Sequence, residues 1–417
     1  MNHKKVEMMY GLNYKKTYFK KVDIDLPTSK SISNRALILS ELLDNKIVIN
    51  QLSLADDTQL MLSVLSSKNN DVNLQNAGTC MRFLTAFFAI KTNKNISLFC
   101  SERMKQRPIK DLVDALIDLG AEIQFLESEN FPPLKIFGKK LSGKPINIDC
   151  SESSQFITAL MLIAPFIDNG IVINLTGKIA SFNYIKMTAL LMNQFGFSVI
   201  LAPNSIEIKE FKNQNVIPCY TIEKDWSSAA FWYLIACLNP QLSIGLNGLS
   251  KTSIQGDAIT FEIFEQLGVL TNETVNGLTI KKNNAANKFS EFDLINAIDL
   301  APALCVACAA LNVNATIYGL QNLKIKESNR LFAIVNELNK FGYNLSNKSD
   351  TIYIKQTNQI DYNKSITINT YNDHRIAMAF APLSILFNQL KMEDVEVVSK
   401  SYPNFFNDLK LVGIVLN

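Results

Sequence analysis

Six segments of the chain are apolar almost all the way round when they are placed on a helix. A helix of this kind belongs in the interior of a protein rather than at its surface. Each segment follows a short polar stretch with serine, threonine, asparagine or aspartate, the residues that favour helix N-termini. The pattern therefore predicts six buried helices with polar N-terminal ends, over residues 31–43, 79–90, 153–164, 227–238, 300–311 and 375–386.

Glycines mark a second periodic feature. Four helix-like segments end at Gly120, Gly196, Gly268 and Gly342, spaced 76, 72 and 74 residues apart, and each leads into a hydrophobic strand. Glycine just after a helix is a typical C-terminal stop. Further strands that run into polar loops, such as 171–182, lie between these segments. The three series predict an α/β chain of six repeated units of roughly 70 residues, each of βαβαββ type.

The length of 417 residues is too great for a single compact core, so we expect two domains of three units each. The expected division is a discontinuous domain of residues 1–26 and 225–417, and an inserted domain of residues 27–224. The active site is expected in the cleft between them.

Composition limits the classes of partner. Charged residues make up 19% of the chain and its net charge is only +3, which argues against bulk attraction to nucleic acid or membranes. Residues 1–10 precede no apolar run of the kind found in signal peptides, so we expect a cytoplasmic protein. The seven cysteines are expected as reduced, mostly buried thiols, and Cys305-x-x-Cys308 lies in an apolar run that does not suit zinc.

Cationic residues gather at the polar starts and loops of the repeated unit. Alone, each is more often a solvated surface charge, but their recurrence at equivalent positions predicts a cationic pocket for a small, multiply anionic substrate. They are Lys30, Arg35, Arg82, Arg103, Lys105, Arg107, Lys326, Arg330, Arg375 and Lys400.

Carboxylates recur beside these cations, at Asp56, Asp57, Asp299, Glu327 and Asp373. The default interpretation of Asp299 is a helix N-cap, and that of Glu327 is a helical surface ion pair. The alternative is that they are acid/base groups of the pocket. His374 has the same two interpretations, as a helix cap or as a residue of the pocket. Kinase P-loops, dinucleotide-binding glycine motifs and the hydrolase nucleophile elbow do not occur in the sequence.

Several motifs together identify a family resemblance. PTSKSISNRAL (27–37), NAGTCMRF (76–83), ERMKQRPI (102–109), ESSQFITAL (152–160), IKESNRL (325–331), YNDHRIAMAF (371–380) and SKSYPNFF (399–406) occur in family order over nearly the whole chain. The chain thereby resembles the 5-enolpyruvylshikimate-3-phosphate (EPSP) synthases, the enolpyruvyl transferases that glyphosate inhibits. The resemblance implies an inside-out α/β barrel of two domains, phosphoenolpyruvate and shikimate-3-phosphate as substrates, and no metal or organic cofactor. A monomer is expected.

The resemblance also implies roles for individual residues. Asp299, Glu327 and Lys30 would be catalytic, with Asp299 the base for the substrate hydroxyl. Shikimate-3-phosphate would bind Lys30, Ser31, Arg35, Ser153, Ser154, Gln155, Ser181, Asp299, Asn322 and Lys326. Phosphoenolpyruvate would bind Lys30, Gly78, Arg107, Gln155, Arg330, Arg375 and Lys400.

Departures from the family pattern are few. Thr28 stands where the family usually has glycine, Asn329 replaces an aspartate, and Phe83 stands where some members have proline. None removes a charged substrate ligand. Two other functions stay open. One is the related transferase that acts on UDP-N-acetylglucosamine, which relies on a loop cysteine. The other is a non-catalytic repeat protein that binds anions.

Overall fold

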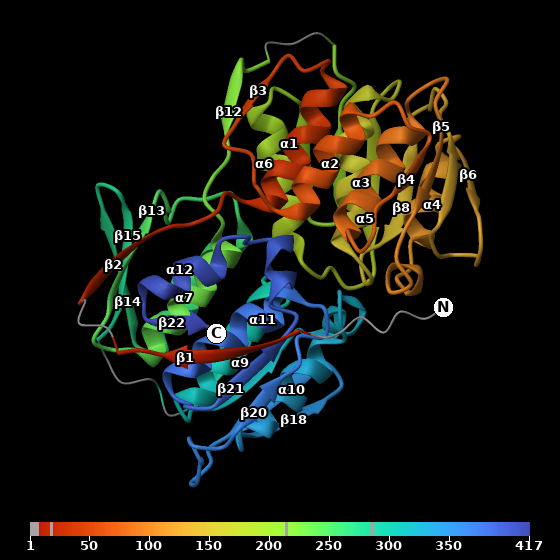
Figure 1. Cartoon of the computed structure of the whole chain (residues 1–417). Coiled ribbons are helices and arrows are strands. Elements are labelled where there is room, and N and C mark those ends of the chain that lie inside the picture. The colour runs from red at the N-terminus through yellow and green to blue at the C-terminus, as the bar shows by residue number, and fades with distance from the viewer. Residues whose placement is uncertain (1–7, 17–19, 213–215, 284–286, 288) are drawn as a thin grey trace. The chain divides into compact units, whose positions relative to one another are not determined.

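The computed structural model describes the chain except residues 1–7, 17–19, 213–215, 284–286 and 288 (Figure 1). The chain divides into two compact units. The inserted unit contains residues 28–223 and 254–256. The C-terminal unit contains residues 224–253 and 257–417 together with the described part of 1–27.

Among the described residues, five four-stranded sheets share one pattern, in which a parallel pair is extended by two antiparallel strands. Strands such as β2 (Lys21–Asp25) alternate exposed and buried residues, so each sheet covers a core with one face. Two sheets belong to the inserted unit: β4 (Asp71–Asn73), β5 (Asn95–Phe99), β7 (Leu134–Phe137) and β6 (Glu122–Phe125); and β8 (Pro145–Asp149), β9 (Ile171–Thr176), β11 (Ser205–Ile208) and β10 (Val199–Ala202). A shorter parallel pair in this unit joins β3 (Val48–Asn50) to β12 (Cys219–Thr221).

The C-terminal unit holds the other three sheets, and two of them take a strand from the start of the chain. β2 pairs with β13, and β1 lies between β21 and β22. The sheets are β2, β13 (Ser243–Asn247), β15 (Gly277–Lys282) and β14 (Val269–Thr274); β16 (Phe289–Asp293), β17 (Asn314–Tyr318), β19 (Thr351–Lys355) and β18 (Asn344–Lys348); and β20 (Ile366–Ile368), β21 (Leu390–Glu393), β1 (Met9–Tyr14) and β22 (Ile414–Leu416).

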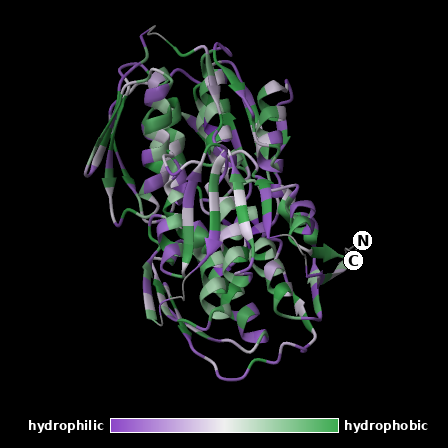
Figure 2. Ribbon diagram, turned by 90° about the vertical axis from the view of Figure 1, so that its left-hand side faces the viewer, coloured by the Kyte–Doolittle hydropathy of each residue, from purple (hydrophilic) through white to green (hydrophobic). Residues whose placement is uncertain are grey.

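Within each unit the most apolar helices pack against one another, and the strands lie around them (Figures 1 and 2). The inserted unit has α1 (Lys30–Leu42), α2 (Asp56–Ser66), α3 (Gly78–Ala89), α4 (Lys110–Asp118), α5 (Ser154–Ile163) and α6 (Phe182–Gln194). The C-terminal unit has α7 (Trp226–Leu238), α8 (Thr260–Glu265), α9 (Ala301–Ala310), α10 (Arg330–Lys340), α11 (His374–Phe380) and α12 (Phe405–Leu411). Burying the helices inside the sheets explains why they are apolar on every side.

The ends of the helices follow the sequence signals. Ser29, Ser153, Asp225 and Asp373 each accept a backbone N–H bond at a helix start. The four periodic glycines have φ between 86° and 103°, the left-handed conformation in which glycine ends a helix at no steric cost. One predicted helix was too long. The segment 375–386 is α-helical only to Phe380 and continues as a 3-10 turn over Ala381–Ile385, where Pro382 cannot donate an α-helical hydrogen bond.

The seven cysteines are free thiols. Five are buried, among them Cys305 and Cys308 in α9, but Cys219 is exposed because its strand β12 belongs to the short two-stranded sheet. Across the described ranges, every helix is too short or too polar to span a bilayer.

Candidate functional site

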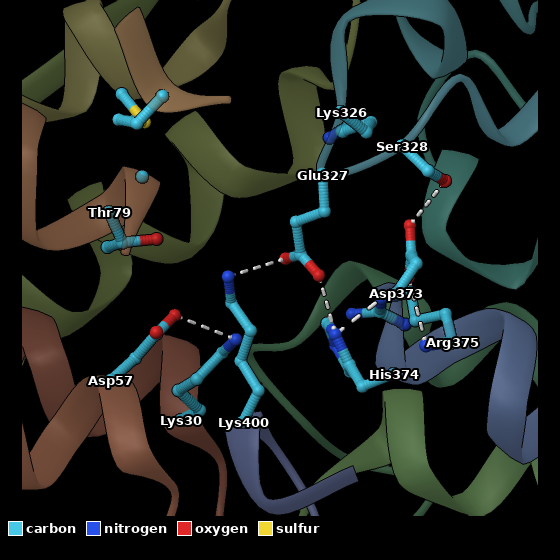
Figure 3. Close-up of polar contacts among 12 residues, drawn as sticks. Lys30, Asp57, Thr79, Lys326, Glu327, Ser328, Asp373, His374, Arg375 and Lys400 are labelled. Atoms are coloured by element: carbon cyan, nitrogen blue, oxygen red, sulfur yellow. Dashed lines mark hydrogen bonds and ion pairs between the residues drawn. The ribbon is translucent and has the colours of Figure 1, made fainter. Parts of the chain in front are cut away.

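The inserted unit brings the starts of α1, α2, α3 and α5 together. Lys30 Nζ lies 3.1 Å from Asp57 Oδ2, which joins the starts of α1 and α2. Cys80 Sγ donates to the Asp57 carbonyl at 3.1 Å, and Gln155 Nε2 donates to Thr79 Oγ1 at 3.2 Å, so α3 is tied to both α2 and α5. We call Lys30, Asp57, Gly78, Thr79, Arg107 and Gln155 the Lys30 cluster, of which Figure 3 labels Lys30, Asp57 and Thr79. It contains four of the predicted phosphoenolpyruvate residues.

Arg107 is placed by a loop that a second arginine anchors. A Cβ built on Gly78 would lie 2.5 Å from Arg107 Nη1, so the guanidinium lies directly against the start of α3. Arg82 is buried one turn into α3 and donates to the carbonyls of Gly78 at 3.2 Å and Pro108 at 3.1 Å. Burial, and then the neighbouring Arg107, lower the pKa of Arg82. From the sequence, Arg82 is recognisable only as one of several cations. Its role as the anchor of the 102–109 loop becomes visible only from its hydrogen bond to the Pro108 carbonyl in the structure.

The other predicted residues of this unit lie at helix starts or inside the core. Arg35 is buried in α1, where it donates to Thr188 Oγ1 at 2.8 Å and to the Ser31 carbonyl at 2.7 Å, and its burial lowers its pKa to about 10. Ser153 caps α5, and Ser154 is the first residue of that helix. Ser181 is at the N-cap position of α6 with a left-handed φ of 60°.

The C-terminal unit assembles a second cluster around Arg330, the first residue of α10. Its Nη1 lies 3.0 Å from Asp299 Oδ1, and its Nε donates to Asp373 Oδ2 at 2.7 Å. Arg375 Nη2 lies 3.1 Å from the other Asp299 oxygen. Glu327 faces His374 Nδ1 at 2.7 Å and Lys400 Nζ at 3.4 Å (Figure 3). The Arg330 cluster comprises Asp299, Lys326, Glu327, Arg330, Asp373, His374, Arg375 and Lys400.

The two default interpretations of the carboxylates do not hold. The N-cap position of α9 is occupied by Leu300, and the Asp299 carboxylate instead contacts two arginines. Glu327 precedes α10 rather than lying on it, and its side chain is only 13% exposed. His374 is not the cap of α11, because Asp373 fills that position. Asn322, also predicted, is buried in the 3-10 turn Gln321–Ile325 before the cluster.

The charges of the Arg330 cluster fix its protonation states. Burial raises the pKa of Glu327, but His374, Lys400 and Arg330 outweigh it and hold that pKa well below its usual range. Burial and the charge of Glu327 raise the pKa of Asp373, but the charge and hydrogen bond of Arg330 together with the charge of His374 outweigh them and lower that pKa. Glu327 is therefore an ionised carboxylate at neutral pH, able to accept a proton but not to donate one.

One subset of this cluster has the spacing of metal ligands. Donor atoms of Glu327, Asp373 and His374 lie within 4.8 Å of one another. However, Arg330 binds Asp373 and Lys400 pairs with Glu327, so a divalent cation would meet charges of its own sign. The arrangement suits an anionic ligand better than a metal ion.

Asp257 is a further buried carboxylate, and it belongs to none of the sequence motifs. It accepts a hydrogen bond from the Ser227 hydroxyl. Burial, followed by the charge of Asp299, raises the pKa of Asp257 to about 6, although Arg375 and Ser227 act in the opposite direction.

We expect Asp257→Asn to remove a pH-dependent loss of stability. An unfolded aspartate ionises near pH ~4, whereas the folded Asp257 keeps its proton up to about pH 6. Because the folded state binds more protons in this window, the free energy of unfolding falls as pH rises through it, by ~3 kcal/mol in total. The variant has no charge to lose, so its stability relative to wild type should rise by about 1–3 kcal/mol from pH ~4 to ~7.

Urea unfolding at several pH values, followed by tryptophan fluorescence, measures this difference. Both tryptophans, Trp226 and Trp232, lie in α7, so the signal reports the C-terminal unit. Parallel pH profiles for the variant and the wild type would contradict the expectation.

The chain is similar to known proteins in sequence and in fold. The family model described as "EPSP synthase (3-phosphoshikimate 1-carboxyvinyltransferase)" matches residues 20–68 and 65–409. A 3-phosphoshikimate 1-carboxyvinyltransferase of Bacteroides fragilis is 43% identical over 393 residues, which cover 94% of this chain and 95% of that protein. One of Haemophilus influenzae is 33% identical and covers 93% and 96%. A structure of EPSP synthase from Acinetobacter baumannii superposes with a TM-score of 0.75 at 20% identity, covering 99% of both chains.

Proposed function

The chain belongs to the EPSP synthase family, and we propose on this basis that it transfers the enolpyruvyl group of phosphoenolpyruvate to the 5-hydroxyl of shikimate-3-phosphate, releasing phosphate. Membership also confirms the inside-out α/β fold that the sequence predicted. The observation that carries the proposal is the Arg330 cluster, where four cations surround two nearly buried carboxylates, Asp299 and Glu327.

Both substrates are multiply anionic, so binding requires cations and N–H donors. In this proposal each unit contributes to one site. Phosphoenolpyruvate is held by Lys30, Gly78, Arg107 and Gln155 of the inserted unit and by Arg330, Arg375 and Lys400 of the C-terminal unit. Shikimate-3-phosphate is held by Lys30, Ser31, Arg35, Ser153, Ser154, Gln155 and Ser181, and by Asp299, Asn322 and Lys326.

The proposed chemistry has an addition and an elimination step. In the addition, the 5-hydroxyl oxygen bonds to C2 of phosphoenolpyruvate, its proton passes to Asp299, and the methylene carbon gains a proton to become a methyl group. In the elimination, the methyl group loses a proton and phosphate leaves C2. Glu327, which is ionised at neutral pH, would take the methyl proton in the elimination. A protonated amine such as Lys30 suits the donation in the addition. The cations offset the repulsion between the two substrates.

Release of phosphate from phosphoenolpyruvate, measured with different acceptors, tests the proposal. We expect release with shikimate-3-phosphate and none with UDP-N-acetylglucosamine or without an acceptor. Release with the UDP-sugar alone would transfer the assignment to the related transferase family. No release with either acceptor, together with binding of both anions, would favour the non-catalytic protein.

We expect Gly78→Ala to weaken phosphoenolpyruvate binding while leaving the fold intact. The new methyl group would meet the end of the flexible Arg107 side chain, which must move away from the start of α3. The KM for phosphoenolpyruvate should rise about tenfold, with kcat changed less, because a contact present throughout the reaction is lost. In Gly11→Ala, a matched control in β1, the added Cβ meets only neighbours at 3.8–3.9 Å. An unchanged KM in Gly78→Ala would remove Arg107 from the proposed site.

We further propose that the protein acts as a monomer in the cytoplasm, which is consistent with its near-neutral charge balance. Size-exclusion chromatography with light scattering measures the oligomeric state, and a mass twice that of the 46.7 kDa chain would overturn the first part.

A further inference from the structure

The segment that leads into α11 has an unusual backbone. Tyr371 and Asn372 are consecutive residues with positive φ, 56° and 53°. Residues with a Cβ avoid this left-handed region, and such strain persists where surrounding contacts hold it. Asp373, His374 and Arg375 follow directly, so the turn at 371–372 sets the direction in which these three side chains enter the Arg330 cluster.

A buried carboxylate on α10 holds this turn. Glu337 is fully buried, and its Oε1 accepts a hydrogen bond from the Tyr371 hydroxyl at 2.6 Å. Its Oε2 accepts from the Asn369 backbone N–H at 3.2 Å and from Lys340 Nζ at 2.8 Å. Asn336 Nδ2 donates to the Tyr371 hydroxyl at 2.8 Å. One carboxylate thus binds the chain at two points, at Asn369 just before the turn and at Tyr371 within it.

The spacing along α10 explains how the turn is fastened on both sides. Arg330 and Glu337 are seven residues apart, close to two helical turns, and therefore lie on one face of α10. Arg330 binds Asp373 with two hydrogen bonds, at 2.7 and 3.1 Å. Glu337 binds Tyr371. One face of α10 therefore forms hydrogen bonds with the two residues that flank Asn372, Tyr371 and Asp373.

We propose that Glu337 and Tyr371 are positioning residues for the reaction, which hold the 371–372 turn so that His374 meets Glu327 and Arg375 meets Asp299. The inference rests on the proposed function. Burial and the Glu337 carboxylate both raise the pKa of Tyr371, so its hydroxyl remains a donor over the working range of pH. The Glu337 carboxylate accepts hydrogen bonds from four donors of the protein itself. Its role is therefore to support the turn and not to transfer a proton in the reaction.

Kinetics of Tyr371→Phe and Glu337→Gln test the proposal. The first variant keeps the ring against Phe332, whose centroid is 6.3 Å away, and loses only the hydroxyl. We expect kcat/KM to fall about tenfold in each, mainly through the KM for phosphoenolpyruvate. The double variant should be no worse than the poorer single one, because both remove the same contact. Tyr353→Phe in β19, a partly exposed tyrosine of the same unit, is the matched control and should match wild type.

An NMR readout separates this inference from the proposed function. The chain has only two histidines, so a His3→Gln variant assigns the ring signals of His374. Tyr371→Phe should shift these signals at constant pH, and Tyr353→Phe should not. A lower melting temperature with unchanged kinetics and unchanged His374 signals would reduce the pair to a structural role and overturn the proposal. If the wild type shows no transfer, the proposed function fails, and the His374 signals alone decide whether the turn is positioned by Glu337.

Discussion

Arg330→Met should lower the free energy of unfolding of the C-terminal unit by about 3–5 kcal/mol, the usual cost of leaving buried charges without their partner. Arg330 is 2% exposed, and its guanidinium contacts Asp299, Glu327 and Asp373. These carboxylates together raise the pKa of Arg330 against the effect of burial, so the charge is present at every working pH. Without it, the fully buried Asp373 keeps the hydrogen bonds from the Ser328 hydroxyl and the Arg375 backbone N–H, with His374 Nδ1 at 3.9 Å, but loses its buried cation.

Urea unfolding followed by tryptophan fluorescence measures this effect in the right unit, because both tryptophans lie in α7. Lys348→Met is the matched control, since Lys348 is exposed in β18, and it should change the free energy by less than about 0.5 kcal/mol. A loss below about 1 kcal/mol in Arg330→Met would show that the three carboxylates are not held by this arginine.

Asp299→Asn should reduce kcat by a factor on the order of 10³, the contribution typical of a general base. The amide keeps the size of the side chain but cannot take the proton of the substrate hydroxyl. Arg330 and Arg375, which contact Asp299 at 3.0 and 3.1 Å, remain in place to bind phosphoenolpyruvate. The KM for phosphoenolpyruvate should therefore change by no more than about threefold, which assigns the loss to the transition state.

Steady-state phosphate release, together with the unfolding assay, measures this variant. Asp361→Asn is the matched control, because Asp361 is an exposed carboxylate of the same unit. Its Oδ1 accepts a hydrogen bond from the Asn363 backbone N–H, and the amide oxygen of asparagine can accept the same bond, so this variant should behave as wild type. A kcat of Asp299→Asn within about tenfold of wild type would assign the base to another residue.

The sequence was informative wherever a signal is local. Segments that are apolar on every side of a helix located the six buried helices, and the polar residues before them located caps such as Ser153 and Asp225. Gly120 and its three counterparts marked helix ends because only glycine adopts their φ freely. The cations of the Arg330 cluster were also found, since each belongs to a short motif.

Contacts between residues that are far apart in the sequence could not be predicted in the same way. Nothing in 9–14 indicates that β1 pairs between β21 and β22, because strand pairing depends on the whole sheet. Asp257 belongs to the short 3-10 helix Gly256–Ile259, whose sequence has no distinguishing pattern, and its raised pKa comes from burial and Asp299. Glu337 looks like an ordinary helix surface residue until its contact with Tyr371, 34 residues away, is known.

Phosphorus NMR of phosphoenolpyruvate mixed with shikimate-3-phosphate and the wild-type protein tests the central claim most directly. We expect the phosphoenolpyruvate signal to be replaced by inorganic phosphate, while the shikimate-3-phosphate signal is converted in equal amount to a new phosphomonoester. Inorganic phosphate without a new phosphomonoester, or loss of phosphate from shikimate-3-phosphate, would show that the protein hydrolyses a phosphate ester and does not transfer the enolpyruvyl group.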